Sequence, residues 1–355
     1  MTVNNQPLVS VVTPVYNGEK YLEECIESVL RQTYSNFDYL IVNNRSKDRS
    51  LEIAQSYARK DSRIRIHDNV EFLDIIGNHN HAFRQILPSV KYCKVVSADD
   101  VILPDCLRQM VEFADANPSV GIVGSYQQSG DRVRWQGFPY PQAVFTGREI
   151  CREFILRHDP EFGFGAPTSL MYRADIVRKT ANFFPNPSPQ SDTSACFAAM
   201  QFSDFGFIYQ VLSYERLHPE TQTTKSAELN CFSPAYLSDL QQYGAHCLSS
   251  EELEMAIKVL LDDYHRFLAL NYFGKSRGED FWNYHRVQLM DLGYPLKRSQ
   301  LFKALLVQVM KGLGNPEQAF RKIRKSKAQK GTTNPSEPIP DGRATPPEAS
   351  ELKRI

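Results

Sequence analysis

The sequence of 355 residues predicts an α/β protein with a mixed, mostly parallel sheet flanked by helices and an α-helical carboxyl-terminal extension. Two observations predict this class. Through the first 125 residues, apolar runs of strand length alternate with apolar residues at helical spacing, which is typical of parallel sheets covered by helices on both faces. Beyond about residue 224 only helical spacing continues.

The amino-terminal elements follow one another closely. Residues 8–12 form a β-branched apolar run that Pro14 is expected to end. Further strand patterns fall at residues 37–42, 63–67, 92–96 and 121–124, and helix patterns at residues 19–32, 48–59, 80–87, 104–116 and 193–200. Between residues 125 and 184 the pattern loosens, and residues 163–167 indicate a shaped loop.

Helical spacing returns at residues 251–272, 280–292 and 299–313. Residues 326–355 are rich in Pro, Ser, Thr, Lys and Glu, a composition that predicts disorder. We therefore divide the chain into a catalytic-type domain at residues 1–225, a helical region at 226–325 and a tail at 326–355.

Composition narrows the class of protein. Lys and Arg number 41, as do Asp and Glu, and this balance argues against a nucleic-acid partner. The seven cysteines are scattered without a CxxC pair, which indicates a reducing compartment rather than a disulfide framework or a zinc site. With no signal peptide and no apolar run of about 20 residues, the chain is expected in the cytoplasm.

An acid pair is the most informative local feature. Asp99 and Asp100 follow the apolar segment at residues 92–96. The carboxyl ends of strands in an open α/β sheet bind ligands, and adjacent carboxylates suit a hard divalent cation. The alternative interpretation is a solvated Asp-Asp turn.

Four further segments accompany the acid pair. They are Thr-Pro-Val-Tyr-Asn-Gly at residues 13–18, the polar stretch at 42–50, Gln-Ser-Asp at 190–192 and Arg-Leu-His-Pro at 216–219. Their order and spacing, with the opening VSVVTPVYNGEKYLEECIESVLRQTY, resemble glycosyltransferase family 2. The family comprises inverting enzymes with a GT-A (Rossmann-like) fold that use nucleotide-sugar donors. The resemblance covers roughly residues 8–222 and is loose beyond residue 125.

The resemblance implies a donor pocket. Tyr16, with the backbone of Pro14 and Val15, would line the nucleobase, since an aromatic face offers a base a stacking surface. A partly buried loop aromatic is the alternative interpretation of Tyr16. Asn44, or Asn43, would hydrogen-bond the edge of the base.

The resemblance to glycosyltransferase family 2 also implies a reaction centre. Asp99 would contact the donor ribose or a metal, and Asp100, the stronger candidate, would help to coordinate Mn²⁺ or Mg²⁺. Asp192 matches the general base that deprotonates the acceptor hydroxyl, and Asp204 is a competitor expected to end a helix. His218 would stabilise the leaving diphosphate.

The chain departs from the family at three positions. Asn43, Asn44 and Ser97 stand where the family commonly has acids, which weakens the case for uridine and leaves two carboxylates for the metal. His79 and His81 form an HxH pattern without a third ligand, so we interpret them as loop or helix-surface residues.

The resulting prediction is a metal-dependent inverting glycosyltransferase. It would transfer a sugar from a nucleotide-diphosphate sugar, with UDP-sugar preferred, to a glycan or lipid-linked acceptor in polysaccharide or surface-glycan synthesis. One alternative is a non-catalytic protein of the same fold that binds nucleotide-sugar or glycan. Another is a sugar nucleotidyltransferase, which would usually carry a Gly-rich basic loop after its first strand.

An apolar run at residues 301–310 directly precedes a basic segment at 312–330. This pattern suits peripheral association with an anionic membrane surface. The alternative is a helix packed on the catalytic domain and followed by a solvated tail.

Overall fold

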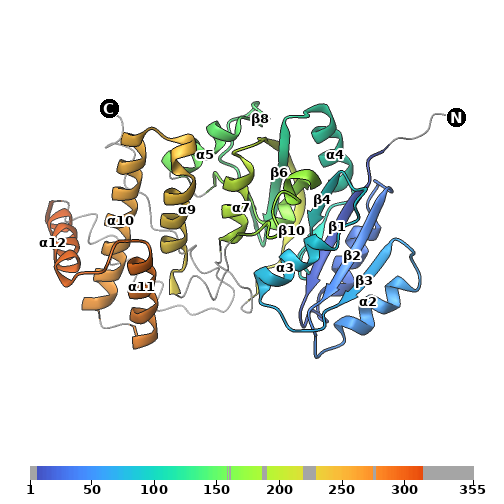
Figure 1. Cartoon of the computed structure of the whole chain (residues 1–355), viewed down its shortest axis with the longest axis horizontal. Helices are drawn as coiled ribbons and strands as arrows, with labels where there is room; N and C mark the ends of the chain where they lie inside the picture. The colour runs from blue at the N-terminus through green and yellow to red at the C-terminus, as the bar shows by residue number, and fades with distance from the viewer. Residues whose placement is uncertain are drawn as a thin grey trace. The chain divides into compact units, whose positions relative to one another are not determined.

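Figure 1 shows a computed structural model of the chain, in which residues 6–157, 159, 161–185, 190–218, 229–274 and 277–314 are described. The chain forms two compact units, Met1–Pro219 and Glu220–Ile355. The expected tail at 326–355 and most of the basic segment at 312–330 lie outside the described residues.

The first unit is built on one mixed sheet with the strand order β3-β2-β1-β4-β9-β6-β10-β5, while β7 pairs with β6 and β8 with β10. Its strands are β1 Val9–Val15, β2 Phe37–Asn43, β3 Ile64–Asp68, β4 Tyr92–Val95, β5 Val101–Ile102, β6 Val120–Ser129, β7 Arg132–Arg134, β8 Val144–Phe145, β9 Leu170–Arg173 and β10 Asp204–Glu215. Neighbours among β3, β2, β1 and β4 are parallel, and β9 is antiparallel to both β4 and β6.

Helices flank this sheet, as Figure 1 shows for α2, α3 and α4. They are α1 Leu22–Leu30, α2 Ser50–Ala58, α3 Ile75–Arg84, α4 Cys106–Ala116, α5 Gly147–Arg157, the 3-10 turn η1 Pro167–Ser169, α6 Ala174–Val177 and α7 Ser191–Ala199. The apolar faces of α1 and α4 pack with the strands in one buried core. The predicted α/β class, with its mixed, mostly parallel sheet, is confirmed.

Three local expectations were wrong. Strand β1 continues through Pro14, which pairs with Val42 on one side only, because the pairing with β4 ends at Val12. Helix α3 begins earlier than the expected residue 80, because the Asp74 side chain caps it by accepting a hydrogen bond from the Gly77 amide. Asp204 begins β10 instead of ending a helix.

The second unit is helical, as expected. It contains α9 Phe232–Cys247, α10 Ser250–Phe273, α11 Glu279–Asp291 and α12 Arg298–Gly314. Side chains such as Leu237, Leu268 and Leu289 form its separate apolar core. Within the described part of the chain, no helix is both long and apolar enough to cross a bilayer.

A buried histidine makes the second unit sensitive to acid. His285 is fully buried, its Nδ1 atom is hydrogen-bonded to the Tyr264 hydroxyl, and burial lowers its pKa to about 4. In the unfolded chain a histidine titrates near pH 6.5, so between these values the unfolded state binds the extra proton. The stability contributed by neutral His285 is therefore lost as pH falls from about 6.5 toward 4.

We expect the free energy of unfolding of this unit to fall by about 1–3 kcal/mol between pH 7 and pH 4. Denaturant titrations followed by circular dichroism measure it. His285→Gln cannot titrate and should show a flatter pH dependence. Some slope should remain, because burial also lowers the pKa of His265. Parallel curves for the wild type and the variant would contradict the assignment.

Candidate functional site

The acid pair lies in the turn between β4 and β5, where the Asp100 amide donates to the Ser97 carbonyl at 3.0 Å. Strand β5 pairs with β10 through Val101 and Tyr214. This pairing places the residues that follow β10 beside the acid pair, although more than a hundred positions separate them in the sequence.

Asp99 and His218 meet in this way. The Oδ2 atom of Asp99 lies 3.0 Å from the Nε2 atom of His218, and the Asp99 side chain is 33% exposed. Arg216 donates from Nε to the Asp99 carbonyl at 3.2 Å, while its guanidinium lies over the Tyr21 ring and pairs with Glu24. Arg216 therefore ties the end of β10 to the acid pair and to α1.

Asp100 points the other way, into the protein, with 6% of its surface exposed. Its Oδ2 atom accepts a hydrogen bond of 2.6 Å from the Thr168 hydroxyl, and its Oδ1 atom accepts one of 3.2 Å from the Arg216 amide. Burial, and next the charge of Asp99, raise the pKa of Asp100 to about 7. Of the two acids, Asp99 thus has the carboxylate that a ligand reaches more readily.

A buried lysine supports this arrangement. Lys94 on β4 is fully buried, and its ammonium donates to the carbonyls of Thr168 and Leu170 at 2.7 and 3.1 Å. The Thr168 hydroxyl in turn accepts a hydrogen bond of 3.1 Å from the Ser97 amide. Lys94 therefore holds η1 in the position from which Thr168 reaches Asp100.

Asp99 and His218 carry side chains of the types that hold a divalent cation. Their separation of 3.0 Å is that of a hydrogen bond between Nε2 and Oδ2, so a bound cation would replace this hydrogen bond with two metal bonds. Among the described residues, no group of three or more His, Cys, Asp or Glu side chains could enclose a metal ion. Further ligands would have to come from a bound phosphate and water, as is common for magnesium.

Tyr16 lies at the carboxyl end of β1 and is 45% exposed. Its ring packs edge-on against Phe72, with the centroids 4.9 Å apart. Asn17, with a left-handed φ of 51°, anchors the loop by accepting a hydrogen bond from the Lys47 amide at 2.8 Å. Pro14 and Val15 belong to β1, so their backbone reaches the same edge of the sheet.

Asn43 and Asn44 are 1% and 3% exposed, and their side chains form hydrogen bonds with neighbouring residues of the chain. Asn43 donates to the Asp68 carboxylate at 2.7 Å. Asn44 donates to the Leu73 carbonyl at 2.7 Å and accepts from the Leu73 amide at 2.9 Å. A contact with a base edge, which stays a prediction for both, would require these bonds to be exchanged.

Asp192 lies in the first turn of α7 and is half-buried. One of its oxygens accepts a hydrogen bond from the Thr193 amide at 2.8 Å. Its competitor Asp204 accepts from the Gly147 amide at 3.2 Å, which gives Asp204 a structural task at the start of α5. The general-base role of Asp192 stays a prediction.

The two histidines of the HxH pattern have different hydrogen-bond partners. His79 bonds the Ile75 carbonyl within α3, whereas the Nε2 atom of His81 lies 2.9 Å from that of His67 on β3. The sequence offered no signal for the His67 partner, because that pairing joins a helix to a strand.

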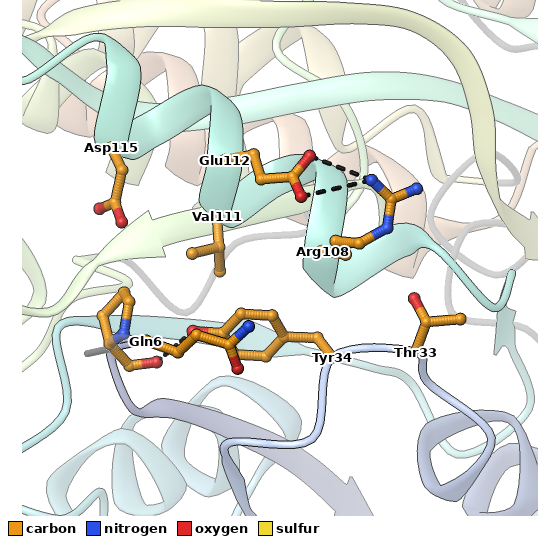
Figure 2. Close-up of a pocket in the computed structure, with 8 residues that line it drawn as sticks. Gln6, Thr33, Tyr34, Arg108, Val111, Glu112 and Asp115 are labelled. Atoms are coloured by element: carbon orange, nitrogen blue, oxygen red, sulfur yellow. Dashed lines mark hydrogen bonds and ion pairs between the residues drawn. The ribbon is translucent and has the colours of Figure 1, made fainter. Parts of the chain in front are cut away.

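A cavity of about 300 Å³ lies at the opposite edge of the sheet, near the amino ends of β1 and β2. Figure 2 shows Arg108, Glu112 and Tyr34 among its lining residues. Arg108 is paired with Glu112 by two hydrogen bonds. The cavity contains none of the predicted site residues, so we assign it no role in the candidate site.

Comparison with known proteins decides the family. Residues 10–180 match the model of "Glycosyl transferase family 2". Residues 10–180 form a glycosyltransferase family 2 domain. The matched part contains the acid pair, Lys94, Thr168 and the loop of Tyr16, so these features belong to the family 2 domain.

Curated relatives of this family 2 domain include bacterial and archaeal proteins. An uncharacterized glycosyltransferase, EpsJ of Bacillus subtilis, is 38% identical over 162 residues, which cover 44% of this chain and 45% of EpsJ. Glycosyltransferase GlyG of Streptococcus pneumoniae is 34% identical over 184 residues, which cover 48% of this chain and 57% of GlyG. The chain thus spans about half the length of the curated relatives it matches.

Solved structures show the same GT-A fold. TarS 1-349 of S. aureus in complex with UDP-GlcNAc superposes with a TM-score of 0.58 at 17% identity, covering 80% of each chain. The mannosyltransferase PcManGT of Pyrobaculum calidifontis, in complex with GDP-Man and Mn²⁺, gives a TM-score of 0.54 at 14% identity and covers 91% of this chain and 85% of that one. The GT-A fold implied by the sequence is confirmed.

The bond between Thr168 and Asp100 can be tested through stability. Thr168→Val leaves a buried carboxylate oxygen and the Ser97 amide without this partner, so the free energy of unfolding should fall by about 1–3 kcal/mol. The matched control Thr168→Ser keeps the hydroxyl and should lose about 1 kcal/mol or less. Urea titrations measure both. Equal losses for the two variants would show that the hydroxyl contributes nothing.

Proposed function

We propose that this family 2 protein is a metal-dependent inverting glycosyltransferase that transfers a sugar from a nucleotide-diphosphate sugar, preferably a UDP-sugar. The acceptor is a glycan or lipid-linked glycan, in polysaccharide or surface-glycan synthesis. The observation that carries the proposal is the pairing of Asp99 with His218, which brings a partly exposed carboxylate and an imidazole, both possible metal ligands, together beside the ends of β4 and β10.

We assign the donor nucleotide to the edge formed by the ends of β1 and β2. The exposed faces of Tyr16 and Phe72 offer an apolar, aromatic surface for a base. Asn44 acts here by holding Leu73, and with it the loop that carries Phe72. The UDP-GlcNAc and GDP-Man complexes of the similar structures support a nucleotide-sugar as the ligand class.

We now prefer Asp99 to Asp100 as the residue that, with His218, would contact the cation. The burial of Asp100 supports this preference, because its carboxylate already accepts hydrogen bonds from the Thr168 hydroxyl and the Arg216 amide. The bound metal, Mn²⁺ or Mg²⁺, would act as a Lewis acid toward the leaving diphosphate. The Mn²⁺ in the PcManGT complex supports a divalent cation.

Inversion requires a base for the acceptor hydroxyl. Asp192 is assigned this role because its half-buried carboxylate stands at the start of α7, on the family 2 segment that the resemblance identifies. Its proton-accepting oxygen would take the hydroxyl proton as the hydroxyl oxygen attacks the anomeric carbon. The bond from that carbon to the diphosphate breaks in the same step.

Asp99→Asn tests the metal-facing pair. Removing one carboxylate charge should weaken Mn²⁺-dependent binding of the nucleotide-sugar at least tenfold, because the cation loses a ligand. Isothermal titration of a panel of nucleotide-sugars with and without Mn²⁺ measures the effect. Glu112→Gln, which removes a carboxylate at the opposite edge of the sheet, is the control and should bind as the wild type does. A wild-type response of Asp99→Asn would contradict the assignment.

Asp192→Asn tests the base. We expect unchanged donor affinity and a turnover number lower by about 10²–10⁴-fold, since only the proton transfer is removed. Steady-state transfer kinetics measure the turnover number, and titration measures the affinity. Wild-type turnover in this variant would exclude Asp192. A wild-type protein that binds nucleotide-sugar and never turns it over would favour the non-catalytic binding protein.

A further inference from the structure

We propose that the outer face of α12 docks on an anionic lipid surface. This face consists of Phe302, Leu306, Val309 and Met310, which are 58%, 62%, 51% and 63% exposed. Their spacing of four, seven and eight residues from Phe302 places them along one side of the helix. Large apolar side chains in such a row remain in contact with water unless another surface covers them.

The fold of the second unit covers this face only in part. Helix α12 packs alongside α10 in Figure 1, and Leu301 and Leu305, on an adjoining side of the helix, contribute to the apolar core. The Phe302 ring extends the row by packing against Phe273 of α10, which is 37% exposed. Folding of the unit thus buries one apolar side of α12 and leaves Leu306, Val309 and Met310 of the adjoining outer face exposed.

The charge of the sequence around α12 indicates which kind of surface covers its outer face. Although the whole chain is balanced, the sequence from residue 292 to residue 336 has Glu317 as its single acid. The basic residues in the same stretch are Lys297, Arg298, Lys303, Lys311, Arg321, Lys322, Arg324, Lys325, Lys327 and Lys330. An apolar helix face joined to a basic segment is the combination that binds the interface of an anionic bilayer.

Other occupants suit the face less well. A second copy of the chain would bring two such basic stretches together, and like charges repel. A nucleic acid would pair with the lysines but would leave the apolar row in water. An anionic lipid surface satisfies both features, with apolar side chains among the acyl chains and cations at the headgroups.

This inference deepens the proposed function, on which its biological meaning rests, by favouring a lipid-linked acceptor over a soluble glycan. A sugar acceptor carried on a lipid is confined to the bilayer surface. An enzyme held there meets it at a higher local concentration than an enzyme in solution. The docking itself can be measured independently of catalysis.

The test is co-sedimentation of the full chain with vesicles of phosphatidylcholine, with and without phosphatidylglycerol. We expect binding only when the anionic lipid is present. The double variant Leu306→Gln/Met310→Gln should bind at least about tenfold more weakly. Arg324→Gln/Lys325→Gln should lose about fivefold for each charge removed. Met255→Gln, which makes the same change at a 45% exposed position of α10, is the matched control and should bind as the wild type does.

The outcomes separate cleanly. Absence of binding to both vesicles, or binding unaffected by either double variant, overturns the proposal. A dimer in sedimentation velocity that Leu306→Gln/Met310→Gln abolishes, without vesicle binding, would identify a second copy as the occupant and also overturn it. Titration of the same variants with nucleotide-sugar and Mn²⁺ should match the wild type. A failure of the proposed function would therefore appear in that titration and not in the vesicle assay.

Discussion

Only 6% of the surface of Asp100 is exposed. A carboxyl group buried this far from water is stable only when hydrogen-bond donors surround it. The donors are the Thr168 hydroxyl and the Arg216 amide, which come from two segments far along the chain. Because Asp100 is held inward, the turn presents Asp99 on the open side, beside His218. The geometry of the candidate reaction centre thus depends on how one neighbouring residue is buried.

The position of Thr168, and so the burial of Asp100, depends in turn on Lys94 of strand β4. A fully buried ammonium is costly, and burial lowers its pKa. Here two backbone carbonyls, those of Thr168 and Leu170, accept hydrogen bonds from the Lys94 Nζ atom. The same bonds hold η1 at the carboxyl end of β4, so β4 leads into the turn of the acid pair and also positions the Thr168 hydroxyl that binds Asp100.

The three departures from the family pattern have a local explanation. Asn43 donates to the Asp68 carboxylate, and an acid in its place would set two negative charges in contact. Asn44 donates to the Leu73 carbonyl, which a carboxylate cannot do. The Ser97 hydroxyl accepts a hydrogen bond of 3.2 Å from the Thr168 hydroxyl. These substitutions fit the packing of this particular loop, so they are compatible with a working donor site.

The sequence by itself determined the fold class and most of the elements up to residue 125, because apolar periodicity is a local property of the chain. It also predicted the segments expected to carry the chemistry. It did not reveal β5, α9, β10 or the short elements between residues 130 and 177, whose formation depends on distant partners. Only the tertiary structure turned Asp100 inward and Asp99 toward His218. It also decided which side of α12 stays exposed. Burial and long-range hydrogen bonding depend on residues that lie far apart in the sequence. Apolar periodicity is a local pattern and therefore does not predict these contacts.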